Sequence, residues 1–213
     1  MSENMKRLQE IKIKRTIEAL KENGINGYSV KDKEQLKELV KSIIEKGSIV
    51  TVGGSMTLFE AGIIDLLRNG DYKFLDRYKE GLTRDEIEKI YRDAFSSDYY
   101  ITSTNALTEK GELYNVDGNG NRVAAMIYGP KKVIVIAGVN KIVKDLDAAI
   151  VRMKEIAAPA NAIRLNRNTP CSKVGHCCDC KSPEKICRDY TVIRSQGDKE
   201  RFHVIIVEEN LGY

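Results

Sequence analysis

All five cysteines of the 213-residue sequence lie in one short segment near its end. Four of them have the spacing Cys-x5-Cys-x2-Cys-x6-Cys, with the positions Cys171, Cys177, Cys180 and Cys187. The central Cys-x2-Cys pair lets one short loop bring two thiolates to a single metal, and four thiolates can hold a tetrahedral zinc ion or an iron–sulfur cluster. The spacing does not distinguish zinc from a cluster, and it leaves Cys178 and His176 as alternative ligands. A redox-active dithiol is the remaining interpretation.

A second group of polar residues lies between Tyr99 and Arg122. Two short strand patterns there, 99–102 and 112–116, are each followed by small polar residues. The second of these runs, 117–121, is longer than the two residues that a tight hairpin turn needs. We therefore interpret this stretch as one wall of a ligand site. Its predicted ligand-binding residues are Ser103, Asn105, Asn119, Asn121 and Arg122.

Three charged residues of this stretch are candidates for a chemical role. Arg122 suits bidentate binding of a carboxylate or phosphate, with a surface or sheet-pairing role as the alternative. Asp117 and Glu112 are candidate catalytic carboxylates that can act as general bases, and Asp117 can also accept a hydrogen bond from a ribose-type hydroxyl. A turn in which Asp117 bonds its own backbone is an equally good interpretation.

A glycine-rich loop follows an earlier strand pattern. Residues 48–52 are rich in β-branched side chains, and the sequence GGSMT comes directly after them, before apolar residues at helical spacing. This order favours anion binding, because glycines admit a ligand close to the backbone and a helix N-terminus attracts negative charge. The predicted ligand-binding residues are Gly53, Gly54, Ser55 and Thr57. The alternative is a tight turn with an ordinary serine cap.

Strand and helix patterns alternate along the chain, which predicts an α/β fold with a Rossmann-like, mostly parallel sheet and an antiparallel hairpin excursion. We expect one domain over residues 1–213, with N-terminal helices over about 3–46 and an irregular cysteine-rich segment over 168–188. Residues 132–137 have the continuous apolar pattern of a buried central strand. Because ligands bind outside the carboxyl ends of parallel strands, we expect the three polar loops to converge.

Composition excludes several classes of function. The net charge is only +4 and the charges are mixed in sign, so there is no basic patch for nucleic acid. No apolar run approaches the ~18 residues of a membrane span, and the charged N-terminus lacks a secretory apolar region, so we expect a cytoplasmic protein. No G-x-S-x-G motif is present. The DGNGNR sequence of residues 117–122 resembles a dinucleotide-binding fingerprint, but we predict that it lies between strands and not before a helix.

Several motifs carry a family resemblance: GGSMTL after a strand, TSTNALTEKGELYNVDGNGNR, YGPKKVIVIAG, the TPC, CxDC and IC elements of the cysteine segment, and a terminal ENLGY. With these motifs the chain resembles the lactate-utilisation (LUD) domain family over about residues 25–213, most specifically over 98–188. The resemblance implies a fold similar to the sugar-phosphate isomerase and CoA-transferase superfamily. Rossmann-like sheets of that superfamily bind phosphorylated sugars, CoA esters or related anions.

The resemblance also implies a function, namely a component of lactate or small hydroxy-acid oxidation. An anionic ligand would bind in the glycine-rich pocket, and the cysteines would hold zinc or an iron–sulfur cluster. The alternatives are an isomerase or acyl/CoA-transfer enzyme that uses Asp117 or Glu112 as base, and a non-catalytic metabolite-binding subunit. The implied partners are a hydroxy acid, sugar phosphate or CoA ester, together with other lactate-utilisation subunits or a second copy of the chain.

Overall fold

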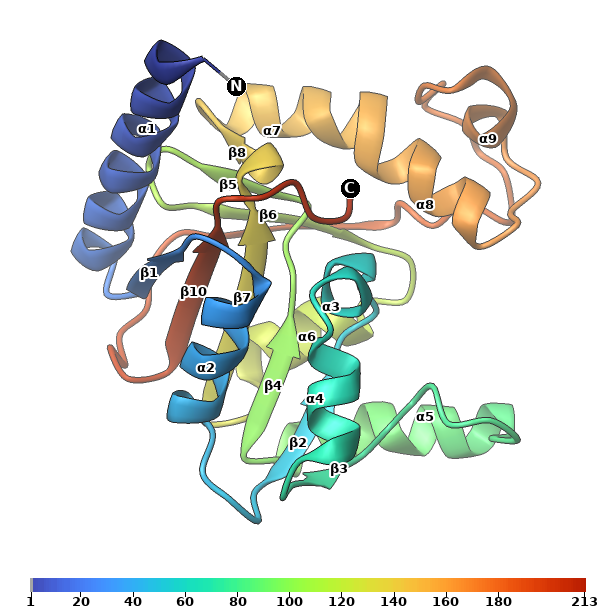
Figure 1. Cartoon of the computed structure of the whole chain (residues 1–213). Coiled ribbons are helices and arrows are strands. Elements are labelled where there is room, and N and C mark those ends of the chain that lie inside the picture. The colour runs from blue at the N-terminus through green and yellow to red at the C-terminus, as the bar shows by residue number, and fades with distance from the viewer. Residues whose placement is uncertain (1) are drawn as a thin grey trace.

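The computed structural model describes residues 2–213, and two β-sheets form its frame (Figure 1). The larger sheet has six strands, all parallel, which confirms the predicted α/β class with a mostly parallel sheet. Its strands in spatial order are β1 (Asn26–Val30), β10 (Phe202–Val207), β7 (Lys132–Gly138), β4 (Tyr99–Thr102), β2 (Ile49–Val52) and β3 (Lys73–Phe74).

Apolar side chains cover both faces of this sheet. Along β7, Val133 and Val135 pack into the core on one face, and Ile134 and Ile136 pack into the core on the other. This alternation follows from the period of two along a strand, and a strand buried on both faces needs a continuous apolar run. The run in β7 therefore gives the predicted central strand, and β10 is buried in the same way.

Helices pack on each face (Figure 1). On one face lie α2 (Lys33–Ile43), α3 (Met56–Glu60) and α4 (Ile63–Asn69), whose buried residues include Leu36, Leu58 and Leu67. The other face is covered by α1 (Glu3–Glu22), by α6 (Asn121–Tyr128) and by the second sheet. The molecule is thus a layered α/β domain with a core on each side of the main sheet.

The predicted hairpin belongs to a separate four-stranded sheet. Its order is β8 (Ile142–Val143), β5 (Ala106–Thr108), β6 (Leu113–Asp117) and β9 (Asp189–Ile193). Strand β6 pairs antiparallel with both β5 and β9, and β5 pairs parallel with β8. The polar residues after β6 are thereby held beside the carboxyl ends of the main sheet.

One prediction about this region is wrong. The Asp117–Gly120 loop does not lie between two strands, because helix α6 begins at Asn121. Gly120 has a φ of 70°, which glycine adopts without steric cost, and it turns the chain into the helix. The carboxylate of Asp117 then accepts hydrogen bonds from the backbone N–H groups of Arg122 (3.1 Å) and Val123 (3.0 Å) at the start of α6. The loop is therefore a strand-to-helix connection.

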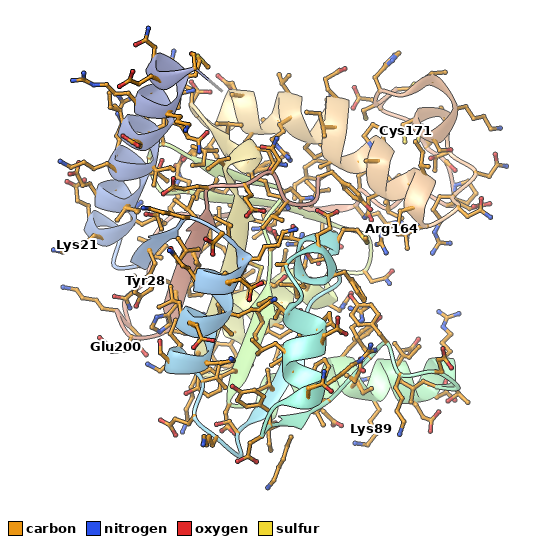
Figure 2. The ribbon with its side chains drawn as sticks, viewed as in Figure 1. Lys21, Tyr28, Lys89, Arg164, Cys171 and Glu200 are labelled. Atoms are coloured by element: carbon orange, nitrogen blue, oxygen red, sulfur yellow. The ribbon has the colours of Figure 1, made fainter. Side chains whose placement is uncertain are left out.

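The remaining helices lie at the periphery. Helix α5 (Arg84–Asp93) follows β3, and α7 (Leu146–Arg152) continues through a π-helical turn into α8 (Ala158–Arg164). The cysteine segment follows, irregular apart from the short helix α9 (Pro170–Val174). Figure 2 shows Arg164 and Cys171 on the side of the molecule away from Lys21 and Tyr28. Over residues 2–213, no helix has both the length and the apolar character needed to cross a bilayer.

Candidate functional site

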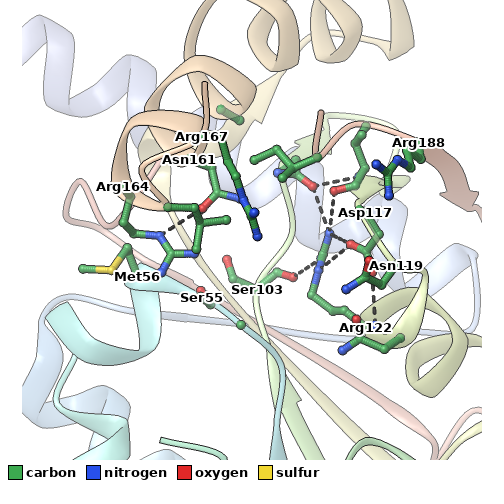
Figure 3. A pocket seen from close by; sticks show the side chains of 18 of the residues that line it. Ser55, Met56, Ser103, Asp117, Asn119, Arg122, Asn161, Arg164, Arg167 and Arg188 are labelled. Carbon is green, nitrogen blue, oxygen red and sulfur yellow. Dashed lines mark hydrogen bonds and ion pairs between the residues drawn. The ribbon is translucent and has the colours of Figure 1, made fainter. Parts of the chain in front are cut away.

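A cleft of about 700 Å³ lies at the carboxyl ends of β2 and β4 (Figure 3). The three predicted loops line it together, one after β2, one after β4 and one after β6. Most of the predicted ligand-site residues therefore share one cavity, namely Gly54, Ser55, Thr57, Ser103, Asn105, Asp117, Asn119, Asn121 and Arg122. A cavity of this size accommodates a small-molecule ligand.

Two predicted residues do not line the cleft. A Cβ atom on Gly53 would lie only 2.5 Å from Thr102 Oγ1, so glycine is needed there for the close approach of β2 and β4. Glu112 lies at the opposite end of β6 from Asp117, where it pairs with Arg194 (3.1 Å) and accepts a hydrogen bond from Thr108 Oγ1 (3.2 Å). The assignment of Glu112 as a catalytic base is corrected, because its carboxylate does not face the ligand cavity.

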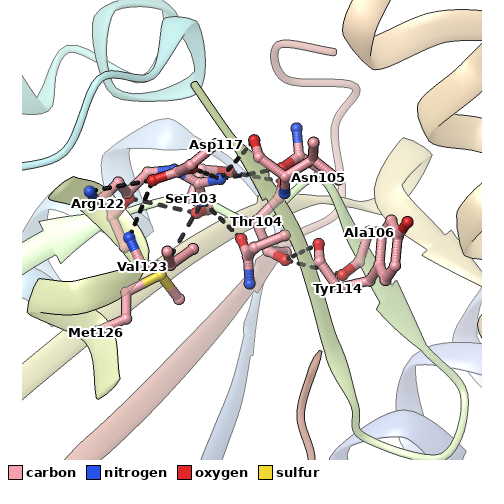
Figure 4. A network of polar contacts seen from close by, with 12 residues as sticks. Ser103, Thr104, Asn105, Ala106, Tyr114, Asp117, Arg122, Val123 and Met126 are labelled. Atoms are coloured by element: carbon pink, nitrogen blue, oxygen red, sulfur yellow. Dashed lines mark hydrogen bonds and ion pairs between the residues drawn. The ribbon is translucent and has the colours of Figure 1, made fainter. Parts of the chain in front are cut away.

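Asp117 and Arg122 form a buried ion pair (Figure 4). Arg122 Nη2 lies 2.6 Å from Asp117 Oδ1, and Arg122 Nε donates to the same oxygen at 2.9 Å. The other carboxylate oxygen accepts the two backbone hydrogen bonds at the start of α6. Both oxygens thus have strong donors already, which favours the structural interpretation of Asp117 over a general base.

The rest of the Arg122 guanidinium joins the loops that line the cleft. Nη1 donates to the backbone oxygen of Ser103 (2.9 Å) and to Oδ1 of Asn115 (2.6 Å), and Nη2 donates to Oδ1 of Asn105 (3.0 Å). These partners use the donors that a bidentate anion would need. The geometry therefore gives Arg122 an organising role, in which it fixes the positions of Ser103 and Asn105.

Other cations of the cleft were not predicted from the sequence. Besides Lys141, which is described below, five of them have no carboxylate within 4 Å among residues 2–213, namely Arg77, Arg164, Arg167, Lys185 and Arg188. The acidic residues that line the cleft are already engaged: Asp117 by Arg122, Glu88 by Arg84, and Glu184 by the backbone N–H of Asn168. The cleft therefore has an excess of positive charge. No local motif identifies these residues, because they come from segments far apart in the chain.

Neutral groups hold several of these cations in place. Arg77 donates to the hydroxyl of Tyr91 and lies over its ring, 4.5 Å from the centroid. Arg164 donates twice to Oδ1 of Asn161, at 2.9 and 2.8 Å. Figure 3 shows Arg164 and Arg167 on the side of α8, with Arg122 and Arg188 on the opposite side. Because the partners are neutral, the guanidinium groups are positioned while their charge stays uncompensated.

Lys141 is a further residue of the cleft that the sequence did not identify. It is 2% exposed, and its Nζ donates to Thr57 Oγ1 (2.8 Å), Ser103 Oγ (2.9 Å) and the backbone oxygen of Thr104 (3.2 Å). Burial, reinforced by the positive charges of Arg152 and Arg122, lowers the pKa of Lys141 to about 7. The available signal was its position just after the buried strand β7, at the ligand-binding edge of the sheet.

The five cysteines gather around a second, small cavity of about 10 Å³. All five are free thiols, and burial raises the pKa of Cys177 and of Cys187. Cys178 lines this cavity with the four predicted ligands, whereas His176 does not. Across the described part of the chain, no three His, Cys, Asp or Glu side chains come together as a metal group. The thiols therefore have suitable donor chemistry but do not form a coordination shell, and the metal remains a prediction.

The fold and the cavity define an α/β domain with a cationic cleft at the carboxyl edge of a parallel sheet. The family model of the LUD domain matches residues 13–207. The chain belongs to the LUD domain family, which confirms the predicted resemblance and extends it toward the N-terminus.

Comparison with solved structures gives one match over most of both chains. A DUF162 family protein from Deinococcus radiodurans shares 13% identity, with a TM-score of 0.54, and the match covers 93% of this chain and 98% of that chain. Weaker similarity extends to eIF2B beta from Chaetomium thermophilum (17% identity, TM-score 0.37, 53% of this chain and 43% of that chain). It also extends to a malonate decarboxylase alpha subunit from Acinetobacter baumannii (11% identity, TM-score 0.38, 97% and 38%). A search of curated proteins returned no match.

Proposed function

We propose that this protein binds a small anionic metabolite in the cleft and acts in the utilisation of lactate or a similar hydroxy acid. The observation that carries the proposal is the convergence of six cations without carboxylate partners around one cavity, namely Lys141 and the five named above. Like charges held together repel one another, and an anion that binds among them relieves this repulsion. The positions of the cations on fixed neutral partners lower the entropy that binding would otherwise cost.

Two features bear on the class of anion. Lactate utilisation is the general role of the LUD family, which favours a hydroxy acid. The number of arginines favours a ligand with more than one anionic group, such as a sugar phosphate or a CoA ester, because guanidinium groups bind phosphates bidentately. We rank the hydroxy acid first, as part of an oxidation system with other subunits. The isomerase or acyl-transfer enzyme and the non-catalytic binding subunit are the alternatives.

Calorimetric titration with lactate, a sugar phosphate and a CoA ester tests the binding proposal. We expect one of these classes to bind, and we expect Arg164→Ala and Arg188→Ala to weaken that binding at least several-fold. Arg7→Ala is the matched control, because Arg7 is exposed on α1 and does not line the cleft. Equal affinities in all three variants would show that the ligand binds elsewhere. Product formation from the bound ligand would separate an enzyme from a binding subunit.

We also propose that the cysteine segment binds zinc or an iron–sulfur cluster. The gathering of five thiols at one cavity supports this, because thiolates are preferred ligands of both groups. Metal content and an absorption spectrum of protein purified without oxygen test it. Iron with visible absorption indicates a cluster, and stoichiometric zinc indicates a structural site. The proposal is contradicted if the wild-type protein contains neither metal and its metal content equals that of a Cys177→Ser/Cys180→Ser variant.

A further inference from the structure

Lys141 is a buried cation of unusual surroundings. It lies in the 3-10 turn Val139–Lys141 that follows β7, and it lines the cleft. Its three hydrogen-bond partners are neutral oxygens, and no carboxylate among residues 2–213 comes within 4 Å of its amine. A buried ammonium without a counter-ion is unfavourable. Either the loss of its proton or the binding of an anion nearby therefore lowers the free energy of the Lys141 site.

The two positive charges near Lys141 lower its pKa, as burial does. Arg152 on α7 and Arg122 on α6 both lower its pKa, after the larger effect of burial. Glu60, at the end of α3, raises the pKa by a smaller amount. The carboxylate of Glu60 is also engaged, because it accepts a hydrogen bond from the backbone N–H of Gly212 (2.7 Å). With a pKa of about 7, the amine of Lys141 is divided between its charged and neutral forms at neutral pH.

The hydrogen-bond shell accommodates both forms. Hydroxyl groups can donate or accept, so Thr57 and Ser103 can accept from the ammonium or donate to the lone pair of the amine. In the charged form their own hydrogens have the backbone oxygens of Leu211 (3.3 Å) and Thr104 (3.4 Å) as acceptors. A proton can therefore arrive or leave without leaving a buried group unpaired. The same two side chains line the cleft, so a ligand there contacts the shell directly.

We propose that Lys141 is the proton-exchanging residue of the anion site: a carboxylate or phosphate group bound against Thr57 and Ser103 brings one proton from solvent onto the Lys141 amine. A new N–H bond forms when the anion binds, and the proton returns to solvent when the anion leaves. This inference rests on the proposed anion binding. It assigns to Lys141 the acid–base role that we predicted from the sequence for Asp117 and Glu112, and it makes the affinity for the anion depend on pH.

The direction of this dependence follows from linkage. Below pH 7 the amine already carries its proton, so binding takes up none. Above pH 7 binding must bring the proton, and the affinity falls by up to about tenfold for each unit of pH. Lysine is suited to this exchange, whereas arginine keeps its charge at every pH in this range.

Calorimetry in buffers of different ionisation enthalpy measures the proton directly. L-Lactate and sulfate are the probes, because neither changes its charge between pH 6 and pH 9 and together they represent the carboxylate and phosphate chemistries. We expect uptake of about one proton by the wild-type protein at pH 8.5 and almost none at pH 6. Lys141→Arg should bind with no uptake and with little dependence on pH. Lys144→Arg is the matched control, because Lys144 is exposed and does not line the cleft, and this variant should keep the uptake.

Binding by the wild-type protein without proton uptake would overturn the proposal, and so would uptake that persists in Lys141→Arg. If neither probe binds, the proposed function fails first, and NMR of protein with 13C-labelled lysine then tests Lys141 alone. Its signal is identified by its loss in Lys141→Arg, or in Lys141→Met if the arginine variant does not fold. A midpoint near pH 7 supports the assignment, and a midpoint near the ordinary lysine value of about 10.4 refutes it.

Discussion

Arg122 and Lys141 are both buried cations beside the cleft, but they differ in their partners. Arg122 has a carboxylate 2.6 Å away and further acceptors on the loop after β4 and on β6, whereas Lys141 has neutral oxygens only. A paired buried charge stabilises the arrangement of its neighbours, and removal of one partner leaves the other uncompensated. An unpaired buried charge costs stability and stays available to a ligand. These two residues therefore serve structure and function respectively.

Arg122→Ala should destabilise the fold strongly. The variant leaves the buried carboxylate of Asp117 without its ion pair and removes the bonds that join the loops after β4 and β6. We expect a loss of about 3–5 kcal/mol in the free energy of unfolding, measured by urea denaturation. The double variant Arg122→Ala/Asp117→Asn should recover part of this loss, since no unpaired charge remains. A loss below about 1 kcal/mol would contradict the organising role of Arg122.

Lys141→Met should stabilise the protein at low pH and weaken anion binding. The pKa of Lys141 is about 7 in the folded state and near its ordinary value when unfolded, so between these values the unfolded state binds more protons. The free energy of unfolding then rises with pH through this window, by up to about 1.4 kcal/mol per unit, and the full cost of the buried charge is present below pH 7. Urea denaturation at pH 6 and pH 9 should show this slope in the wild-type protein. The difference between the two proteins isolates Lys141, and identical slopes would refute the prediction.

Helix α5 shows how a whole element positions one charge. It begins at a complete capping box, in which Thr83 and Glu86 bond each other's backbone N–H groups, and none of its residues is buried. It contributes Arg84, Ile87, Glu88 and Tyr91 to the cleft, and Tyr91 holds the Arg77 guanidinium. A helix with so little burial depends on its cap to stay formed.

Thr83→Ala should therefore loosen α5 and reduce the affinity for an anion. Loss of the cap costs about 1 kcal/mol, and amide hydrogens of residues 84–93 should exchange faster with solvent. Asp32→Ala is the matched control, because Asp32 caps α2 through Gln35 and lies outside the cleft. Both variants lose one cap, and only Thr83→Ala should change the affinity. Equal affinities in the two variants would mean that Arg77 needs no support from α5.

Sequence patterns predict elements here because the signals for elements are local. The apolar run of β7, the capping box of α5 and the glycine loop after β2 each lie within a few residues, and each has the predicted structure. The connection at Asp117 was misassigned because an Asp-Gly sequence serves a hairpin turn and a helix start equally well. The helix that follows, α6, decides between them.

The charge of the cleft has no local signal. Arg77 follows β3, Arg164 ends α8, and Lys185 and Arg188 lie in the cysteine segment, so only the folded chain brings them together. Whether an arginine forms an ion pair is also non-local, because it depends on which carboxylates the fold places beside that arginine. The motif residues Asp117 and Arg122 drew attention by their types, yet they bond each other. Lys141, within an unremarkable loop sequence, is a buried cation of the cleft without a carboxylate partner.

At the scale of the molecule, the cysteine segment is a wall of the cleft as well as the candidate metal site. Lys185 and Ile186 line both cavities, so the two sites are in direct contact. The segment is joined to the second sheet, because the backbone N–H of Arg188 donates to the backbone oxygen of Asp117 (2.8 Å). It is also joined to the π-helical turn, because the backbone N–H of Cys177 donates to the backbone oxygen of Lys154 (2.9 Å). A ligand bound in the cleft and a metal bound by the thiols would therefore both order the same stretch of chain.

Two ligands that order one segment favour each other's binding, and the coupling is reciprocal. We expect a saturating anion to slow amide hydrogen exchange over residues 183–188, in addition to the loops at 54–57 and 103–105. If the protein binds zinc, zinc should raise the affinity for the anion by the same factor by which the anion raises the affinity for zinc. Both factors follow from calorimetric titrations with and without the other ligand, and a Cys177→Ser/Cys180→Ser variant should lose the coupling while it keeps anion binding. Slower exchange at the inner loops with none at 183–188 would show that the anion binds without contact to the cysteine segment, and the two sites would then be independent.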